Sequence, residues 1–265
     1  MATRRRLTVA DIRALKGVRQ LTMMRVETWQ ELAAAEAAGI DSVSVPPAMM
    51  TDPRFRDVAP GVFAVPGVNF FELGTADDFV RWAFAMLRAG ADAVYCSASY
   101  ATVEALAREN VPVIGHVGLI PSRATWTGGF RAVGKTAESA LSVWNAVKAY
   151  ESAGAFGAEI EVVPAEVAAE ISRRTHLFMV SMGAGAGCDC QYLFATDVLG
   201  TNRGHIPRHA RVYRNLAKME DRMQKERIAA FREYVADVAS GAFPAESEIL
   251  SIDAKELAAF RKALG

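Results

Sequence analysis

A repeated pattern of helix, Ala-Gly and strand is the feature that most constrains how this chain can fold. Ala38-Gly39, Ala89-Gly90 and Ala153-Gly154 each close an alanine-rich segment and precede a short apolar run. Glycine ends helices because it adopts the left-handed conformation at little cost, and a short turn then leads into a strand. The pattern therefore predicts alternating helices and strands with parallel pairing.

The apolar runs that follow this pattern give enough strands for a closed barrel. Seven strands are expected at residues 20–24, 41–45, 62–65, 92–96, 111–116, 158–163 and 177–181, with a weaker eighth near 197–201. Eight such units predict an α/β fold, a (β/α)8 TIM barrel, with chemistry at the C-terminal strand ends and stabilising turns at the opposite end. An open doubly wound sheet is the alternative.

One domain is expected to span all 265 residues, because 51% of the chain is apolar and barrels of this size are commonly single domains. Charged helices from about residue 210, at 210–240 and 254–264, are expected to pack on the barrel or on a neighbouring subunit. Thirty basic and thirty acidic residues cancel, which argues against nucleic acid or an acidic membrane as a partner.

The chain also lacks the marks of a secreted or membrane protein. No apolar stretch is long enough to span a bilayer, and none follows the basic opening Arg4-Arg5-Arg6, which we expect to be a disordered end. Cys96, Cys188 and Cys190 are too few for a disulfide framework. The expected location is therefore the cytoplasm.

Residues 113–135 join a buried strand to a long loop punctuated by glycine. The strand delivers His116 at its C-terminal end, and Gly118, Gly128 and Gly129 allow the following backbone to fold over a ligand. This arrangement is typical of an active-site loop. A purely structural corner is the alternative, because glycine and proline mark turns of every kind.

The same segment resembles the ketopantoate hydroxymethyltransferase (3-methyl-2-oxobutanoate hydroxymethyltransferase) family, whose members carry a Gly-His-x-Gly-Leu-x-Pro strand end and a Gly-Gly-aromatic-basic-x-x-Gly-basic loop. Further blocks match in the same order: Glu161-Val-Val-Pro-Ala-Glu, Gly183-Ala-Gly, Asp189-x-Gln191, Gly204-His-Ile-Pro-Arg208 and Ser240-Gly-Ala-Phe-Pro244. The likeness covers about residues 10 to 250. It implies a barrel of the phosphoenolpyruvate mutase-like type and a ring-based homo-oligomer.

In the family that this chain resembles, carboxylates at strand ends hold a magnesium ion that chelates a 2-oxo acid. The resulting enolate attacks a one-carbon unit carried by methylenetetrahydrofolate. Here the family's Gly-Asp-Ser becomes Pro46-Pro47-Ala48, its Ala-Asp-Leu-Pro-Phe becomes Pro66-Gly67-Val68-Asn69-Phe70, and its Lys-Ile-Glu-Gly becomes Tyr95-Cys96-Ser97-Ala98. The metal-site carboxylates and the substrate-anchoring lysine are gone, so we expect no metal and no cofactor in a rebuilt pocket.

Two candidate catalytic residues remain. Glu161 matches the family's proposed general base and ends a strand, although a carboxylate there is also favoured by the dipole of the following helix. His116 matches the family histidine, and an imidazole orients or protonates an oxyanion near neutral pH. A satisfied core histidine is the alternative for His116.

Three further residues are expected to bind the substrate. Arg25 ends the first strand, where its guanidinium would hold a carboxylate bidentately, unless it is an ordinary surface arginine. Tyr95 and Ser97 share one strand face by the two-residue period and are expected to point inward with their hydroxyls. Cys96 would then be a small core residue on the outer face.

These features predict a metal-independent enzyme that forms or cleaves a carbon–carbon bond of a small oxo or carboxylate substrate by proton abstraction. A transferase or lyase of this family is the main hypothesis. A lyase, hydrolase or decarboxylase of the wider barrel group is one alternative, and a non-catalytic paralogue that binds a metabolite is the other. We expect no nucleic-acid or membrane partner, and we expect a homo-oligomer.

Overall fold

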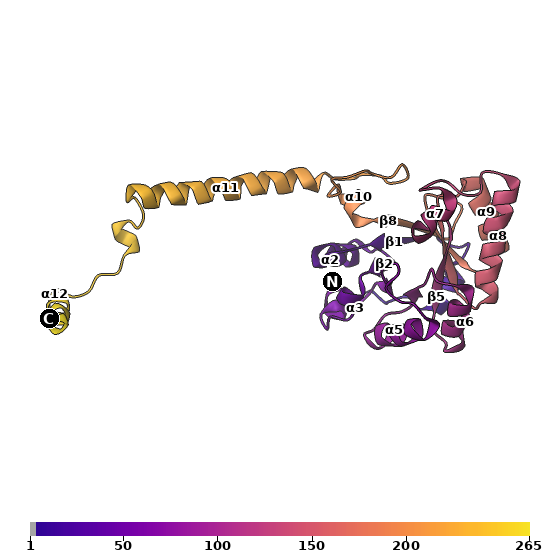
Figure 1. Cartoon of the computed structure of the whole chain (residues 1–265), viewed down its shortest axis with the longest axis horizontal. Helices are drawn as coiled ribbons and strands as arrows, with labels where there is room; N and C mark the ends of the chain where they lie inside the picture. Colours follow the sequence, from indigo (N-terminus) through magenta and orange to yellow (C-terminus); the bar gives the residue numbers. More distant parts are fainter. Residues whose placement is uncertain (1–3) are drawn as a thin grey trace. The chain divides into compact units, whose positions relative to one another are not determined.

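A computed structural model describes residues 4–265 of the chain (Figure 1). The chain divides into two compact units, and the boundary in the sequence lies between Arg214 and Asn215. The first unit contains eight parallel strands: β1 (Leu21–Arg25), β2 (Ser42–Val45), β3 (Phe63–Pro66), β4 (Val94–Tyr95), β5 (Val113–Gly118), β6 (Gly157–Glu161), β7 (Phe178–Met182) and β8 (Cys190–Phe194).

The strands close into a barrel, which confirms the predicted fold class. Their order is β3-β2-β1-β8-β7-β6-β5-β4, so β1 pairs with β8, and β3 and β4 are the two edges. A parallel bridge between Gly67 and Tyr95 joins those edges, and the Asp92 amide donates to the Ala64 carbonyl at 3.0 Å. The open doubly wound sheet is therefore excluded.

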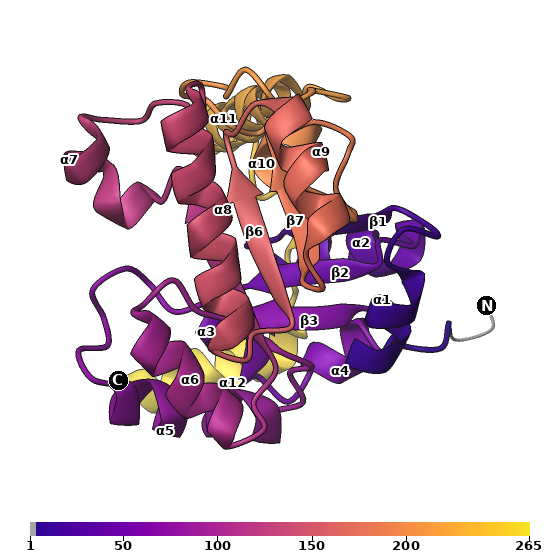
Figure 2. The same cartoon turned by 90° about the vertical axis from the view of Figure 1, so that its right-hand side faces the viewer.

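Helices surround the strands, and α8 and α9 run along the outside of β6 and β7 (Figure 2). The helices of the first unit are α1 (Val9–Leu15), α2 (Trp29–Ala38), α3 (Pro47–Met50), α4 (Phe55–Val58), α5 (Ala76–Arg88), α6 (Tyr100–Arg108), α7 (Ala124–Thr127), α8 (Ala137–Ser152), α9 (Ala165–Arg174) and α10 (Ala195–Leu199). There are also two short 3₁₀ turns, η1 (Pro121–Arg123) in the first unit and η2 (Glu246–Glu248) in the second.

The ends of these helices follow from their sequence. Thr28 and Thr75 are the N-caps of α2 and α5, and each forms a capping box. The threonine hydroxyl accepts from the backbone amide three residues later, and the acidic side chain of that residue accepts from the threonine amide. Gly39 lies in the left-handed conformation after α2. Gly90 and Gly154 follow α5 and α8 with positive φ, as the Ala-Gly pattern predicts.

The prediction of the eighth strand was wrong in position. It lies at Cys190–Phe194, whereas residues 195–199 form α10, which Gly200 ends in the left-handed conformation. Cys190 and Tyr192 point into the barrel, where they pack with the inner core. The sequence of this strand gives a weak signal, because none of its residues carries a β-branched side chain.

Two apolar layers hold the barrel together. Side chains such as Ala158 and Ile160 face outward and pack under the helices. Leu21, Phe63 and Phe178 belong to a second cluster inside the barrel, which also contains Ile12 of α1. The strand alternation therefore places Glu159 and Glu161 of β6 inside the barrel, because they alternate with Ala158 and Ile160.

Buried or half-buried aspartates precede three strands at the end of the barrel opposite to the strand C-termini, here called the floor. Asp41, Asp92 and Asp189 accept backbone amides of the neighbouring strands at 2.8 to 2.9 Å. Each also meets a cation, which is Arg19 at 2.9 Å, Arg56 at 2.7 Å and Lys16 at 2.7 Å respectively. These contacts join consecutive strands and their turns, as expected at the stabilising end of a barrel.

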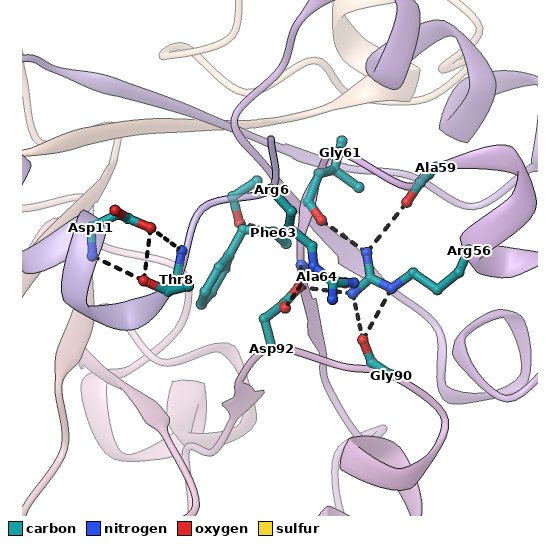
Figure 3. A network of polar contacts seen from close by, with 12 residues as sticks. Arg6, Thr8, Asp11, Arg56, Ala59, Gly61, Phe63, Ala64, Gly90 and Asp92 are labelled. Atoms are coloured by element: carbon teal, nitrogen blue, oxygen red, sulfur yellow. Dashed lines mark hydrogen bonds and ion pairs between the residues drawn. The ribbon is translucent and has the colours of Figure 1, made fainter. Parts of the chain in front are cut away.

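The basic opening is part of the floor, so the prediction of a disordered end is wrong for its described residues. Arg4 donates to the Gly39 carbonyl at 2.6 Å. Arg6 lies 3.3 Å from Asp92, beside Arg56 (Figure 3). These arginines bind backbone carbonyls and a half-buried carboxylate, and such contacts order the segment in a way that composition alone does not reveal.

The second unit consists of α11 (Leu216–Ser240), η2 and α12 (Ala254–Leu264). Its two long helices lie where charged helices were predicted. Their packing on the barrel or on a neighbouring subunit stays a prediction. Within residues 4–265, no helix is both long and apolar enough to cross a membrane.

Candidate active site

A cavity of about 500 Å³ opens at the C-terminal ends of the strands. All eight strands supply lining residues, either from the strand or from the position directly after it. In strand order these residues are Arg25, Ser44, Gly67, Tyr95, His116, Glu159, Glu161, Met182, Tyr192 and Phe194. Barrel enzymes collect their catalytic groups on this face, so the cavity, here called the mouth, is the candidate active site.

His116 and Glu161 meet inside the mouth. The His116 Nε2 atom lies 3.0 Å from the Glu161 carboxylate and 3.9 Å from the Glu159 carboxylate. All three side chains are buried, with exposed fractions of 3%, 8% and 4% for His116, Glu161 and Glu159. The structure therefore brings together the two residues predicted to be catalytic, and it adds a second carboxylate beside them.

Tyr95 extends this cluster on the other side of the imidazole, where its hydroxyl is hydrogen-bonded to His116 Nδ1. Burial and the neighbouring Glu159 raise the pKa of the Tyr95 phenol well above its usual range, so the hydroxyl keeps its proton. Burial similarly raises the pKa of Tyr192 on the opposite wall. The mouth thus holds two phenols that donate hydrogen bonds at any physiological pH.

The electrostatics of the cluster favour a retained proton. Burial raises the pKa of Glu159 to about 6; His116 opposes this rise and Glu161 adds to it. Burial alone would lower the pKa of His116, but Glu159 and the hydrogen bond to Glu161 outweigh it and raise the pKa. Two buried carboxylates next to one imidazole cannot all ionise without a large cost in free energy.

Arg25 lines the same cavity, as the sequence predicted for a residue at the end of the first strand. Its Nε atom donates to Glu27 at 2.6 Å, and its Nη1 atom donates to the Ser44 hydroxyl at 3.2 Å. Only 17% of the Arg25 side chain is exposed, whereas 44% of the Glu27 side chain is. The guanidinium is held in the mouth by a carboxylate that solvent can reach.

Ser97 does not line the mouth. β4 ends at Tyr95, so the alternation that would carry Ser97 inward stops before it. Ser97 instead lines an adjoining cavity of about 380 Å³, and its carbonyl accepts from Arg123 at 3.0 Å. Cys96 is fully buried in the outer core, as predicted, and burial raises the pKa of its thiol to about 11.

The backbone around Glu161 is fixed by two unusual conformations. Gly118 has φ +85°, and a Cβ atom there would lie 2.4 Å from the Glu161 carbonyl oxygen. Val162 has φ +50°, which is strained for a β-branched residue. Its amide donates to the Met182 carbonyl at 2.8 Å, and such hydrogen bonds hold the strained position. The glycine of the Gly-His-x-Gly motif therefore allows β5 and β6 to approach at the site.

Glu159 is the site residue that the sequence reasoning missed. A signal was available, because the Glu-Ile-Glu sequence of β6 places both carboxylates on one strand face by the two-residue period.

The residues present do not fit the magnesium site of the family that the sequence resembles. Pro47, Gly67 and Ser97 offer no carboxylate at the positions where the sequence comparison places the family's ligands. Among residues 4–265, the groups that gather as candidate metal ligands are His116, Glu159 and Glu161, with one ligand atom from each within 4.8 Å of the others. His116 and Glu161 are already hydrogen-bonded to each other there, and a cation would have to replace that contact.

The family model and the most similar curated proteins that we compared name the same enzyme. The family model described as ketopantoate hydroxymethyltransferase matches residues 60–246. A protein of Nitratidesulfovibrio vulgaris named 3-methyl-2-oxobutanoate hydroxymethyltransferase is 32% identical, over 98% of this chain and 90% of its own length. A protein of the same name from Thermus thermophilus is also 32% identical, over 91% of this chain and 98% of its own.

Solved structures resemble the fold at much lower identity. The structure of 2,3-dimethylmalate lyase, a member of the PEP mutase/isocitrate lyase superfamily, has a TM-score of 0.52 and 13% identity, and the match covers 98% of this chain and 100% of that one. Phosphonopyruvate hydrolase in complex with oxalate and Mg²⁺ has a TM-score of 0.51 and 14% identity, over 97% and 96% of the two chains. At such identities the likeness concerns the barrel alone.

Proposed function

Because the chain belongs to the ketopantoate hydroxymethyltransferase family, we propose that it is an enzyme that removes a proton next to the oxo group of a small 2-oxo acid and then forms or breaks a carbon–carbon bond there. The observation that carries the proposal is the buried contact of 3.0 Å between Glu161 and His116 in a cavity that also holds Arg25. A positioned carboxylate base beside an imidazole is suited to proton abstraction.

We assign Glu161 as the base and His116 as the group that orients it. Tyr95 fixes the imidazole from its other nitrogen, so the Nε2 edge faces Glu161. Arg25 binds the substrate carboxylate, and the exposed Glu27 is the partner that the substrate carboxylate would replace. Ser97 has no role in this assignment, because it lines the adjoining cavity.

The reaction is proposed to run without a divalent cation, because the positions of the family's ligands hold no carboxylate in this chain. Synthesis of ketopantoate from 3-methyl-2-oxobutanoate and methylenetetrahydrofolate is then expected to fail, with or without Mg²⁺. Loss of a preorganised cation at a developing enolate removes several kcal/mol of transition-state stabilisation unless other groups replace it.

Deuterium exchange tests the proposal without knowledge of the second substrate. The protein is incubated with 3-methyl-2-oxobutanoate and other 2-oxo acids in D2O with EDTA, and the loss of the C3 proton signal is followed by NMR. We expect exchange by the wild type and none by Glu161→Gln. Exchange that requires added Mg²⁺ would contradict metal independence, and equal exchange by Glu161→Gln would remove the base assignment.

A non-catalytic metabolite-binding paralogue is the second candidate function, since lost ligand positions are also what a decaying active site produces. It predicts binding of a 2-oxo acid without exchange. A titration calorimetry experiment run beside the exchange assay separates the two functions.

A homo-oligomer is the proposed assembly. No residue of α11 is buried, although Met219, Met223, Phe231 and Val235 recur along it at nearly helical spacing. Such a stripe favours burial against another protein surface. Light scattering of the wild type should show a mass above the 28.6 kDa of one chain, and Phe231→Asp should lower it while the control Glu233→Gln does not.

A further inference from the structure

The mouth contains one buried carboxylate more than the proposed base requires. Glu159 lies one strand period before Glu161 on the same inner face of β6, and both line the cavity. The charged or titratable groups around Glu159 are Tyr95 from β4, His116 from β5, Glu161 from β6, and Tyr192 and Arg25 from β8 and β1. Of these, only His116 lies within ion-pairing distance of Glu159.

Full ionisation of this arrangement costs free energy. Glu159 is 4% exposed and its one close cationic partner, His116, already bonds Glu161 at 3.0 Å. Arg25 is committed to Glu27 and Ser44. The shared imidazole cannot neutralise both carboxylates, so Glu159 holds its proton to a higher pH than an isolated glutamate would.

We propose that Glu159 is a second catalytic residue of this site, an acid that protonates the substrate oxo oxygen while Glu161 takes the proton from the adjacent carbon. The inference rests on the proposed function and deepens it. It assigns to a protonated carboxyl group the role of stabilising the charge on the enolate oxygen. A neutral carboxyl in an apolar, buried setting is able to donate such a hydrogen bond.

The step balances within the protein and the 2-oxo acid. The C3–H bond breaks and its proton goes to the Glu161 carboxylate, while its electron pair forms the C2–C3 double bond. The C2–O π pair takes the proton from the Glu159 carboxyl, which leaves a neutral enol and an ionised Glu159. Reversal returns both protons, and in D2O the carbon acquires deuterium.

Two neighbouring groups connect the carboxylates between turnovers. His116 contacts Glu161 through Nε2 and Tyr95 through Nδ1, and the Tyr95 hydroxyl interacts with Glu159. A proton left on Glu161 can therefore pass to His116, whose Nε2 atom lies 3.9 Å from the Glu159 carboxylate, or through the imidazole to Tyr95 beside Glu159. His116 and Tyr95 are positioning residues on this route.

The first test reads protonation directly and needs no activity. Infrared difference spectra between pH 4.5 and 8.5 should show the carbonyl band of a buried carboxylic acid in the wild type and in the control Glu166→Gln, whose side chain is exposed on α9. The band should be absent in Glu159→Gln. A band that persists in Glu159→Gln would overturn the inference, and so would a wild type without any such band above pH 4.5.

The second test measures the reaction. Glu159→Gln should slow C3 deuterium exchange of 3-methyl-2-oxobutanoate at least 100-fold, as expected for loss of a general acid, with less than a threefold change in Kd. Glu159→Asp should recover part of the rate, because it keeps a carboxyl, and it also covers the case in which Gln fails to fold. Exchange by Glu159→Gln at the wild-type rate would sink the inference and leave Glu161 as the base.

Failure of the proposed function gives a different result. If neither the wild type nor any variant exchanges a 2-oxo acid, the proposed reaction is wrong, while the infrared band still decides whether Glu159 holds a proton. If Mn²⁺ binds the wild type in calorimetry, and binding is lost in Glu159→Gln but kept in Glu166→Gln, the cluster holds a cation and the inference is overturned.

Discussion

The two ends of the barrel differ in how their buried and half-buried carboxylates are paired. On the floor, Asp41, Asp92 and Asp189 each accept a backbone amide and each meet an arginine or lysine within 3 Å. In the mouth, Glu159 and Glu161 share a single imidazole. The same type of group is therefore fully compensated at one end of the strands and undercompensated at the other.

The difference separates stability from chemistry. Burial opposes ionisation of Asp41, but Arg19 and the Thr22 contacts outweigh it, so the pKa of Asp41 is lowered. The pKa of Glu159 is raised instead. Asp41 therefore stabilises the fold at neutral pH, whereas Glu159 costs free energy there, which is expected where a group is kept reactive.

The largest expected effect is on activity in the mouth. Glu161→Gln should reduce C3 deuterium exchange by roughly 10²- to 10⁴-fold, because the amide cannot accept the proton. The free energy of unfolding should change by less than about 1 kcal/mol, since Gln preserves the shape of the side chain. NMR exchange rates and urea unfolding of the same preparation check both. A stability loss as large as the activity loss would make Glu161 a structural residue.

The floor should show the reverse behaviour. Asp92→Asn weakens the contacts with Arg6 and Arg56, so the free energy of unfolding should fall by about 2 kcal/mol, as expected when charged donors lose a partner. Exchange per folded molecule should stay within twofold. Urea unfolding and the NMR assay measure these quantities. If Asp92→Asn lost exchange activity without losing stability, the floor would not be a purely stabilising end of the barrel.

Arg25 tests whether the mouth is built for an anion. Arg25→Ala should weaken binding of a 2-oxo acid by roughly 50-fold, because a charge-assisted contact to the carboxylate is lost. The exposed Arg54, which pairs with Asp52, provides the control Arg54→Ala. Titration calorimetry measures both. Equal affinities would favour a pocket that no anionic substrate uses.

Much of this comparison was accessible from sequence because it depends on local patterns. The Ala-Gly endings fixed the register of helices and strands, so Glu161, His116 and Arg25 were correctly expected at strand ends of one barrel face. The two-residue period failed for Ser97, because β4 is only two residues long. Local patterns do not report where a strand stops.

The remaining errors have a common physical cause, which is that pairing partners come from distant parts of the chain. Arg6 is ordered by Asp92, 86 positions away, so its composition suggested a disordered end. Glu159 became significant only when β5 placed His116 against it. The pKa of a charged group and its contribution to stability depend on these spatial neighbours rather than on the adjacent sequence.

The smallest effect, and the most direct comparison of the two ends, concerns stability against pH. Glu159 has a pKa of about 6 in the fold against 4.5 for an ordinary glutamate, so its contribution to stability is present below pH 4.5 and is lost as the pH rises through about 6. Glu159→Gln removes this loss. The variant should therefore match the wild type at pH 4.5 and exceed its free energy of unfolding by about 2 kcal/mol at pH 8.

Asp41 provides the opposite sign. Its lowered pKa stabilises the fold above pH 3.8, and that stability is lost as the pH falls. Asp41→Asn should therefore be less stable than the wild type at pH 8 and approach it in acid, whereas Glu159→Gln separates from the wild type only toward alkaline pH. Urea unfolding of the three proteins between pH 3.5 and 8 measures both trends. If Glu159→Gln were less stable than the wild type at pH 8, the Glu159 carboxylate would be stabilised by its neighbours as the floor carboxylates are. Ionised Glu159 would then not destabilise the fold, and the contrast between the two ends would be wrong.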